Sequence, residues 1–293
     1  MPKRDENQNK FQSTPRSRNS GISVLVTAYN REQFLGQALD SLIRQTYCHF
    51  EVILITNFHF DLSNYSALNV RHFIQEGTIG SFLYTGVVNS NYDIICFLDD
   101  DDLFNANKLE VIARYFDDSL TVFVHNNYDL IDENGVVRGS SRSHVTSNLS
   151  AQSILRSAID LDTLKNIYAS PDLAMYLFAL TYGGKVHDLS TKLSLYRRHS
   201  QNISSFSRDN IQFMEITLCQ FMAFEALFKN RPCMRIIKFN KQDFRLAISS
   251  VTKVKTPFVF IRTLCNLALN FKLTLLRVFL RYFIEDYIRI SDH

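Results

Sequence analysis

The sequence lacks the cysteine and histidine spacing of a metal cluster or a disulfide framework. Its cysteines are odd in number, far apart and without a CxxC pair: Cys48, Cys96, Cys219, Cys233 and Cys265. Scattered, reduced cysteines are typical of cytosolic proteins. We therefore expect them to be packing residues in a cytoplasmic protein.

Long uninterrupted apolar runs are missing as well. Residues 1–20 are polar and have no apolar core like that of a secretory signal, so we expect a disordered tail. The apolar stretch near the C-terminus contains Arg262, Lys272, Arg277 and Arg281, which makes it a poor transmembrane span. The whole chain is nevertheless 46% hydrophobic over 293 residues, which is enough to bury a full core.

Charge is distributed unevenly around a net value of +3. From Arg231 to the end, twelve Lys and Arg face four acidic residues, a local excess of +8 (12 − 4). Residues 1–20 add +3 (5 − 2), so residues 21–230 carry −8 by difference. An acidic body with a basic C-terminal part predicts that an anionic surface lies next to the C-terminus.

The first elements of the folded part form a strand, helix and strand pattern. Residues 21–30 (GISVLVTAYN) predict a buried strand and a polar turn, and Glu51–Thr56 predicts a second strand. Between them, REQFLGQALDSLIRQTY repeats its apolar residues at helical spacing. Such a unit joins two parallel strands by a right-handed crossover. Weaker patterns indicate a short strand at 71–74 and a short helix at 80–88.

The most unusual stretch begins with the apolar strand Ile94–Leu98, which is followed by four consecutive aspartates, Asp99–Asp102. Adjacent carboxylates repel one another unless a cation or nearby donors offset their charge. Hard oxygen ligands suit Mg²⁺ or Mn²⁺. The alternative is an acidic turn that caps a helix starting near Asn105.

Polar residues also follow the other predicted strands. Tyr29, Asn57 and Asp99 each lie just past the carboxyl end of a separate strand. In open α/β sheets, ligands bind at that edge. This convergence favours a ligand site over a simple acidic turn.

Three blocks of the sequence resemble, in order and spacing, the landmarks of family 2 glycosyltransferases with the GT-A fold. The blocks are SVLVTAYNREQFLGQALDSLIRQTYCHFEVILI, IICFLDDDDLFNANKLE and GGKVHDLSTKLSLYRRHSQNIS. The resemblance implies an α/β fold over residues 21–204, with a Rossmann-like, mixed and mainly parallel sheet flanked by helices. Residues 205–293 then form a basic, amphipathic helical appendage.

The resemblance implies that Thr27, Tyr29 and Asn30 help to hold the base of a nucleotide sugar. Stacking of Tyr29 on a flat base is physically reasonable, and a tyrosine packed at a strand end is the alternative. Asn57 stands where the family most often has an Asp that accepts a hydrogen bond from uracil. An amide can donate as well as accept, so the identity of the base stays open.

The metal motif of the family, Asp-x-Asp followed by Asp, maps onto Asp99, Asp101 and Asp102, with Asp100 in the variable slot. Asp101 is the expected direct ligand of Mg²⁺ or Mn²⁺, and Asp99 is expected to face the ribose or the metal. We also place Asp99 and Asp100 among the residues that bind the nucleotide sugar. The ion would neutralise the departing diphosphate.

Asp172 falls where the family carries its general base, which deprotonates the acceptor hydroxyl opposite the leaving group. The alternative is an acidic residue that compensates a helix dipole. The sequence Tyr196 to His199 matches the family's Y-R-x-H loop, so Arg198 and His199 are expected to clamp the diphosphate. A solvated basic loop is the competing interpretation.

Several positions depart from the family pattern. Pro171 replaces a Glu before the expected base, and Leu83 and Tyr84 replace a common Arg-Asn pair. These changes motivate a rival hypothesis, a non-catalytic protein that binds a nucleotide sugar or a partner through the same fold. His125, His144, His187 and Asp188 show no partner spacing and are expected to be ordinary surface or packing residues.

The leading hypothesis is a metal-dependent, inverting glycosyltransferase that moves a sugar from a nucleotide diphosphate to an acceptor hydroxyl. The expected acceptor is a saccharide or a lipid-linked molecule in surface polysaccharide or glycolipid synthesis, and no nucleic-acid partner is expected. Alternating apolar turns and bases near the C-terminus favour helices lying peripherally on the cytosolic face of a membrane. A helical lid or a dimer contact is the alternative.

Overall fold

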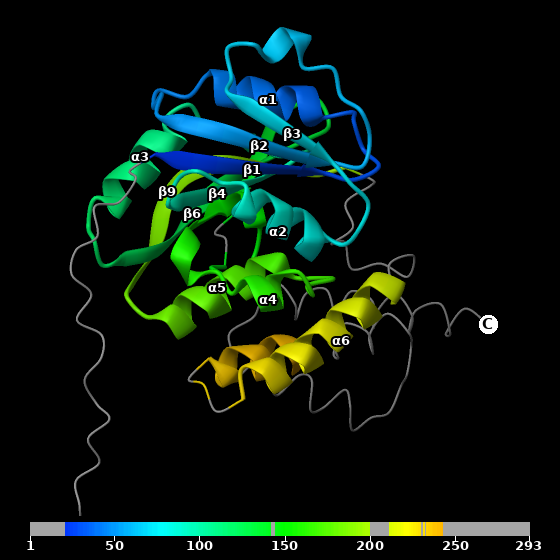
Figure 1. The fold of residues 1–293 in the computed structure, drawn as a ribbon, viewed down its shortest axis with the longest axis vertical. Coiled ribbons are helices and arrows are strands. Elements are labelled where there is room, and N and C mark those ends of the chain that lie inside the picture. The colour runs from blue at the N-terminus through cyan, green and yellow to red at the C-terminus, as the bar shows by residue number, and fades with distance from the viewer. Residues whose placement is uncertain (1–20, 142–143, 200–210, 230, 232, 243–293) are drawn as a thin grey trace, which may run out of the picture.

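A nine-stranded mixed sheet forms the centre of the described part of the chain (Figure 1). The computed structural model describes residues 21–141, 144–199, 211–229, 231 and 233–242. The strands are β1 (Ile22–Ala28), β2 (Phe50–Thr56), β3 (Val70–Ile74), β4 (Ile94–Asp99), β5 (Leu103–Phe104), β6 (Thr121–Ile131), β7 (Val137–Ser141), β8 (Gln152–Leu155) and β9 (Lys185–Arg197). The helices are α1 (Leu35–Ile43), α2 (Ile79–Val88), α3 (Lys108–Phe116), α4 (Leu161–Leu164), α5 (Pro171–Tyr182) and α6 (Ile211–Leu227).

One half of the sheet is entirely parallel. Strand β1 pairs with β2 and β4, and β2 pairs with β3, all in the parallel sense. In Figure 1, α1 lies on one side of these strands, and α2, α4 and α5 lie on the other. Strands covered on both faces favour apolar residues, and β1 and β2 are near-continuous apolar runs that also bury a few polar residues such as Ser23 and Glu51. The predicted β1, α1 and β2 unit is confirmed.

The other half of the sheet is mixed. Strand β8 pairs antiparallel with β4 and β6, whereas β9 runs parallel to β6 and antiparallel to β5. Strands β6 and β7 form an antiparallel hairpin. Gly135 adopts a positive φ of 79° in its turn, a conformation that glycine adopts without strain.

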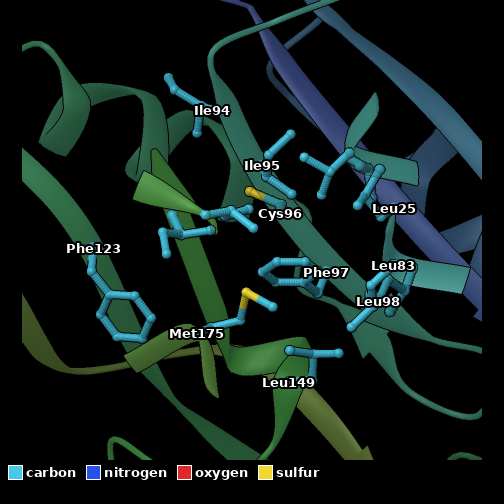
Figure 2. Close-up of a cluster of buried hydrophobic side chains, with 14 of the residues drawn as sticks. Leu25, Leu83, Ile94, Ile95, Cys96, Phe97, Leu98, Phe123, Leu149 and Met175 are labelled. Carbon is cyan, nitrogen blue, oxygen red and sulfur yellow. The ribbon is translucent and has the colours of Figure 1, made fainter. Parts of the chain in front are cut away.

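The core fills both sides of β4, as Figure 2 shows. Leu25, Phe97 and Met175, from β1, β4 and α5, are all completely buried. A Cβ at Gly86 would lie 2.8 Å from a methyl carbon of Leu25, so the close contact of α2 with β1 requires a glycine there.

A second glycine brings two backbone segments together. Gly80 in α2 donates its N–H to the carbonyl of Ile167 (2.9 Å). A Cβ at Gly80 would lie 2.3 Å from the carbonyl oxygen of Leu164. Helix α2 therefore contacts the segment that leads into α5 through main-chain atoms.

Helix α6 lies beyond α5 in Figure 1. The rings of Phe178 and Phe228 are 6.3 Å apart, and the N–H of Tyr168 donates to Gln220 Oε1 (2.8 Å). Residues 234–242 are also helical. The predicted tail at 1–20 and the apolar stretch beyond residue 242 lie outside the described residues.

Candidate functional site

The carboxyl ends of three parallel strands meet at one edge of the sheet. The strand register places Thr27 directly beside Ile55 of β2 and Asp99 of β4. The N–H of Asp100 also donates to the carbonyl of Thr27 (3.2 Å). The structure therefore brings together the strand-end residues that the sequence predicted to converge.

The first part of the site is an asparagine pair beside an exposed tyrosine. Asn57 accepts from the N–H of Asn30 (2.8 Å) and donates to its side-chain oxygen (2.7 Å). Asn30 has a φ of 53°, which asparagine tolerates better than most residues. Tyr29 is 53% exposed and touches Phe82 only edge to face. Its ring is therefore open on one side, as a stacking surface requires.

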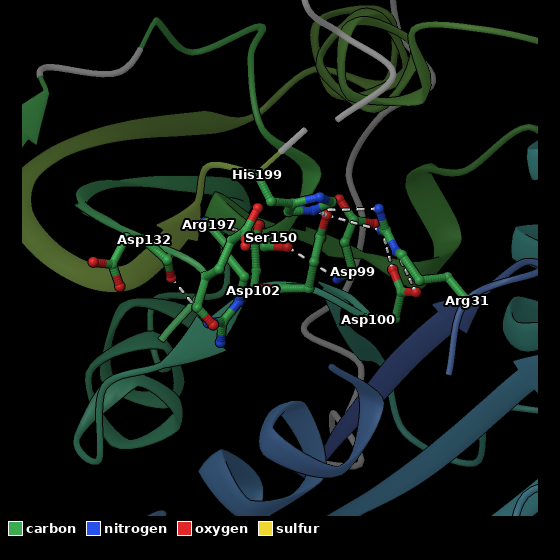
Figure 3. A network of polar contacts seen from close by, with 10 residues as sticks. Arg31, Asp99, Asp100, Asp102, Asp132, Ser150, Arg197 and His199 are labelled. Carbon is green, nitrogen blue, oxygen red and sulfur yellow. Dashed lines mark hydrogen bonds and ion pairs between the residues drawn. The ribbon is translucent and has the colours of Figure 1, made fainter. Parts of the chain in front are cut away.

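The second part is the acidic cluster, which holds a residue that sequence reasoning missed (Figure 3). Arg31 Nε donates to Asp100 Oδ2 (2.8 Å), and a terminal nitrogen pairs with the other oxygen of Asp100. The same nitrogen lies 2.8 Å from Asp101 Oδ2. The sequence feature that could have identified Arg31 is its position directly after Asn30, just past the end of β1.

His199 reaches the same carboxylate from the end of β9. Its Nε2 lies 2.9 Å from Asp101 Oδ2, and Arg31 lies 3.4 Å from the same ring nitrogen. His199, which the sequence predicted to clamp a diphosphate, therefore lies beside the acidic cluster. The predicted clamp Arg198, in contrast, is exposed.

Arg197 is the arginine of this loop that is drawn into the protein. It is completely buried, and its guanidinium lies 4.6 Å from the ring of Phe34. It donates to the carbonyls of Asp101, Asp132 and Glu133, to Gln37 Oε1 and, through its backbone N–H, to Asp102 Oδ1. These bonds hold the β4 turn against the β6–β7 hairpin, so Arg197 is a structural residue.

Ser150 binds the end of β4, and Lys108 in turn binds Ser150. Ser150 Oγ accepts the N–H of Asp99 (2.9 Å), and the carbonyl of Ser150 accepts from Lys108 Nζ. Lys108 also donates to Ser194 Oγ (2.9 Å) and lies 3.9 Å from the ring centre of Phe104. Burial lowers the pKa of Lys108 to about 7. Neither residue was identified from the sequence.

Burial and mutual repulsion raise the pKa values of Asp99, Asp100 and Asp102. Burial raises the pKa of Asp99 to about 8, and the charges of Asp101 and Asp100 act in the same direction. Burial also raises the pKa of Asp100 to about 6, although Arg31 opposes the shift. The pKa of Asp102 lies well above its usual range, chiefly because of burial. An added cation would relieve this excess of negative charge.

The donor set fits a divalent ion that takes further ligands from a substrate. Asp99, Asp101 and His199 offer oxygen and nitrogen donors, and Asp102 Oδ2 is buried without a hydrogen-bond partner. Within the described residues, no three His, Cys, Asp or Glu side chains are gathered closely enough to hold an ion unaided. Mg²⁺ sites are commonly built from one or two carboxylates, water and substrate phosphates. Asp102 is fully buried, so Asp99 and Asp101 are better placed as ligands.

Asp172 lies in the first turn of α5. Its Oδ1 accepts the N–H of Leu173 (2.8 Å), and Pro171 occupies a first-turn position that suits proline. Burial raises the pKa of Asp172 to about 6, and the charge of Asp172 contributes to the raised pKa of Asp99. Asp172 is therefore an acidic residue of the first helical turn that binds a backbone N–H, and its carboxyl group is also within electrostatic reach of the acidic cluster.

His125 and Asp188 show no partner spacing in the sequence and were expected to be ordinary surface or packing residues. In the structure His125 is fully buried, and its Nδ1 lies 2.8 Å from Asp188 Oδ1, a contact that links β6 to β9. Leu83, which replaces a polar residue of the family, is completely buried in the core.

Comparison with known proteins identifies the family. The model of glycosyl transferase family 2 matches residues 23–201. The chain belongs to glycosyl transferase family 2. This confirms the resemblance stated above. Among curated relatives, an uncharacterized glycosyltransferase of Rickettsia bellii is 34% identical over 126 residues, which cover 40% of this chain and 18% of that protein.

Other relatives carry more informative names. The Escherichia coli protein WfgD, a UDP-Glc:alpha-D-GlcNAc-diphosphoundecaprenol beta-1,3-glucosyltransferase, is 27% identical over 124 residues, covering 40% of this chain and 49% of WfgD. The chain thus spans half or less of these curated relatives.

Solved structures confirm the GT-A fold. The Pyrobaculum calidifontis mannosyltransferase PcManGT, solved with GDP-Man and Mn²⁺, gives a TM-score of 0.57 at 12% identity, over 96% of this family 2 chain and 90% of PcManGT. S. aureus TarS 1-349, solved with UDP-GlcNAc, gives 0.56 at 16% identity, over 78% of this chain and 73% of TarS.

Proposed function

We propose that this chain transfers a sugar from a nucleotide diphosphate donor to an acceptor hydroxyl, with inversion and with the help of Mg²⁺ or Mn²⁺. The observation that carries the proposal is the meeting of Tyr29, Asn57 and the aspartates at one sheet edge. The names of WfgD and PcManGT, with their nucleotide sugars, support this activity class.

Different residues bind the base and the ion. The open face of Tyr29 stacks on the base, and the Asn30–Asn57 pair offers hydrogen bonds to its edge. Asp99 and Asp101 hold the ion, with His199 beside them. The ion, when bound, withdraws negative charge from the diphosphate as the bond to the sugar breaks.

Asp172 provides the base. The acceptor oxygen forms a bond to the anomeric carbon while the carbon–oxygen bond to the diphosphate breaks, and Asp172 takes the hydroxyl proton. A pKa of about 6 leaves the carboxylate mostly ionised near neutral pH, yet more basic than an ordinary aspartate.

A membrane surface is the proposed neighbour of α6, where a lipid-linked acceptor would be found. The exposed face of α6 is apolar at helical spacing: Ile216, Cys219, Met222, Ala223, Ala226 and Leu227. Exposed bases follow at Lys229, Arg231, Arg235 and Lys238. Such an arrangement suits contact with anionic lipid. Within the described residues, no helix combines the length and apolar character needed to cross a bilayer.

Turnover of a donor panel tests the activity. The wild-type chain is incubated with Mn²⁺ and UDP- or GDP-sugars, and release of the nucleotide is measured. Asp172→Asn is expected to keep nucleotide binding and to lose about 10²- to 10⁴-fold in kcat. Asp162→Asn is the matched control, because Asp162 is exposed and pairs only with Lys165 in the structure. Nucleotide binding by both forms without product from either would favour the non-catalytic rival.

Vesicle co-sedimentation tests the membrane surface. Leu227→Glu is expected to reduce binding to anionic vesicles, because it places a charge in the apolar face. Leu120→Glu is the control, since Leu120 is equally exposed, at 57%, on another part of the molecule. Equal binding by both variants and the wild type would contradict the proposal.

A further inference from the structure

Arg31 takes up the oxygen that an ion would need. Asp101 Oδ2 lies 2.8 Å from Arg31 and 2.9 Å from His199 Nε2, so both groups share one carboxylate oxygen. This is one of the two carboxylates to which the proposed function assigns the ion. An ion cannot bind that oxygen well while a guanidinium and an imidazole contact it.

We infer that Arg31 is a displaceable counter-ion, which occupies Asp101 until a donor diphosphate arrives and thereby makes metal binding depend on the donor. The inference rests on the proposed function and goes beyond it, because it assigns a role to a residue outside the expected metal and base positions.

The contacts of Arg31 with the two carboxylates differ in strength. Asp100 receives two hydrogen bonds from the guanidinium and is only 3% exposed, so it anchors the side chain. Asp101 receives contact from a single nitrogen. Two-point contact is the stronger and more directional arrangement. A rotation of the guanidinium can therefore release Asp101 while Asp100 still holds Arg31.

Charge explains why the donor would cause this release. A divalent ion without substrate has to approach a positive guanidinium at short range, and that repulsion weakens binding. A diphosphate supplies negative charge and oxygens that fit the fork of an arginine. Arg31, with its side chain 19% exposed, can turn toward such a group and leave Asp101 to the ion.

Arg197 cannot act in this way, although it is close to the same turn. Its side chain is completely buried, and it already donates to Asp101, Asp132, Glu133 and Gln37. Arg31, in contrast, is partly exposed and can exchange partners.

Binding of Mn²⁺ without nucleotide provides the first test. Free Mn²⁺ is measured by electron paramagnetic resonance during titration of the full chain. Arg31→Gln is expected to bind Mn²⁺ about tenfold more tightly than the wild type, because a nearby positive charge is removed. Arg71→Gln is the control, since Arg71 pairs with Glu51 elsewhere. Equal Mn²⁺ affinity of Arg31→Gln and the wild type would overturn the inference.

The coupling between nucleotide and metal provides the second test. UDP and GDP are each added, and the factor by which the nucleotide tightens Mn²⁺ binding is compared between variants. This factor is expected to be large in the wild type and several-fold smaller in Arg31→Gln. An unchanged factor in Arg31→Gln would overturn the inference and leave the proposed function intact. If the wild type binds no Mn²⁺ with either nucleotide, the metal-dependent function itself fails.

Arg31→Lys covers the case in which Arg31→Gln does not fold, which melting curves would show. Lysine keeps the charge but loses the fork, so Mn²⁺ binding without nucleotide is expected to lie between the wild type and Arg31→Gln. Wild-type Mn²⁺ affinity together with wild-type coupling in Arg31→Lys would count against the inference.

Discussion

The two halves of the sheet are stabilised by different interactions. In the parallel half, Val24, Leu25 and Ile53 are completely buried among other apolar side chains. In the mixed half, strands β6 and β9 bury polar groups such as Asn126 and Arg197. Apolar burial requires only a suitable pattern along the chain, whereas each buried polar group requires a specific partner. The candidate site lies where these two halves meet.

The largest expected effect is a pH dependence that arises in the acidic cluster. Asp99 binds its proton more tightly when folded, with a pKa of about 8 against an ordinary 3.8. The folded state therefore holds more protons between these values, so the free energy of unfolding falls as pH rises through this range. Asp99→Asn should flatten the decline in urea unfolding measured from pH 4 to pH 8. The same slope in both proteins would contradict the raised pKa.

Replacement of the buried Arg197 tests how much its hydrogen bonds stabilise the mixed half of the sheet. Arg197→Met removes the guanidinium that donates to the carbonyls of Asp101, Asp132 and Glu133, of which Asp132 still accepts from the N–H of Gly135. Loss of one partner from a buried charged network typically costs about 3–5 kcal/mol. Urea unfolding should show a decrease of this size, and Arg198→Met should show little change because Arg198 is exposed. Similar losses in both variants would refute the structural role of Arg197.

The parallel half should instead lose stability when side-chain volume is removed from its apolar core. Leu25→Ala removes packing against Gly86 and neighbouring core residues. Such core truncations cost about 2–5 kcal/mol, and the loss should not depend on pH. Unfolding measured at two pH values checks this, and a strongly pH-dependent loss would show that the two halves are not independent.

The smallest expected effect concerns the support of Asp99. Ser150→Ala removes the hydroxyl that accepts the N–H of Asp99. An unsatisfied buried donor costs about 1–3 kcal/mol. Unfolding of Ser150→Ala should show this loss, whereas Ser150→Thr should restore most of it because the hydroxyl is kept. A stability equal to the wild type in Ser150→Ala would mean that the donor finds another acceptor.

The sequence was informative where neighbours along the chain determine structure. The apolar runs of β1, β2 and β4 and the polar residues after them predicted the sheet edge and its ligand site. Arg197 and Arg198 show the limit: Arg197 is the buried last residue of β9 and Arg198, just past the strand, is exposed, and a local motif does not say which of two neighbours is buried. Arg31 and Lys108 were missed because their partners lie 69 and 86 residues away in the sequence.

The glycine at position 80 has a consequence for how this site can change. Main-chain atoms of α2 contact main-chain atoms of Leu164 and Ile167 there. Backbone dimensions therefore fix the spacing between α2 and the segment that precedes Asp172. No exchange of side chains elsewhere can shorten that spacing. Even a single methyl group at residue 80 would wedge the two segments apart. On the proposed function, a substitution at residue 80 would therefore act on the catalytic step by displacing the segment that leads to Asp172, although residue 80 itself contacts no substrate.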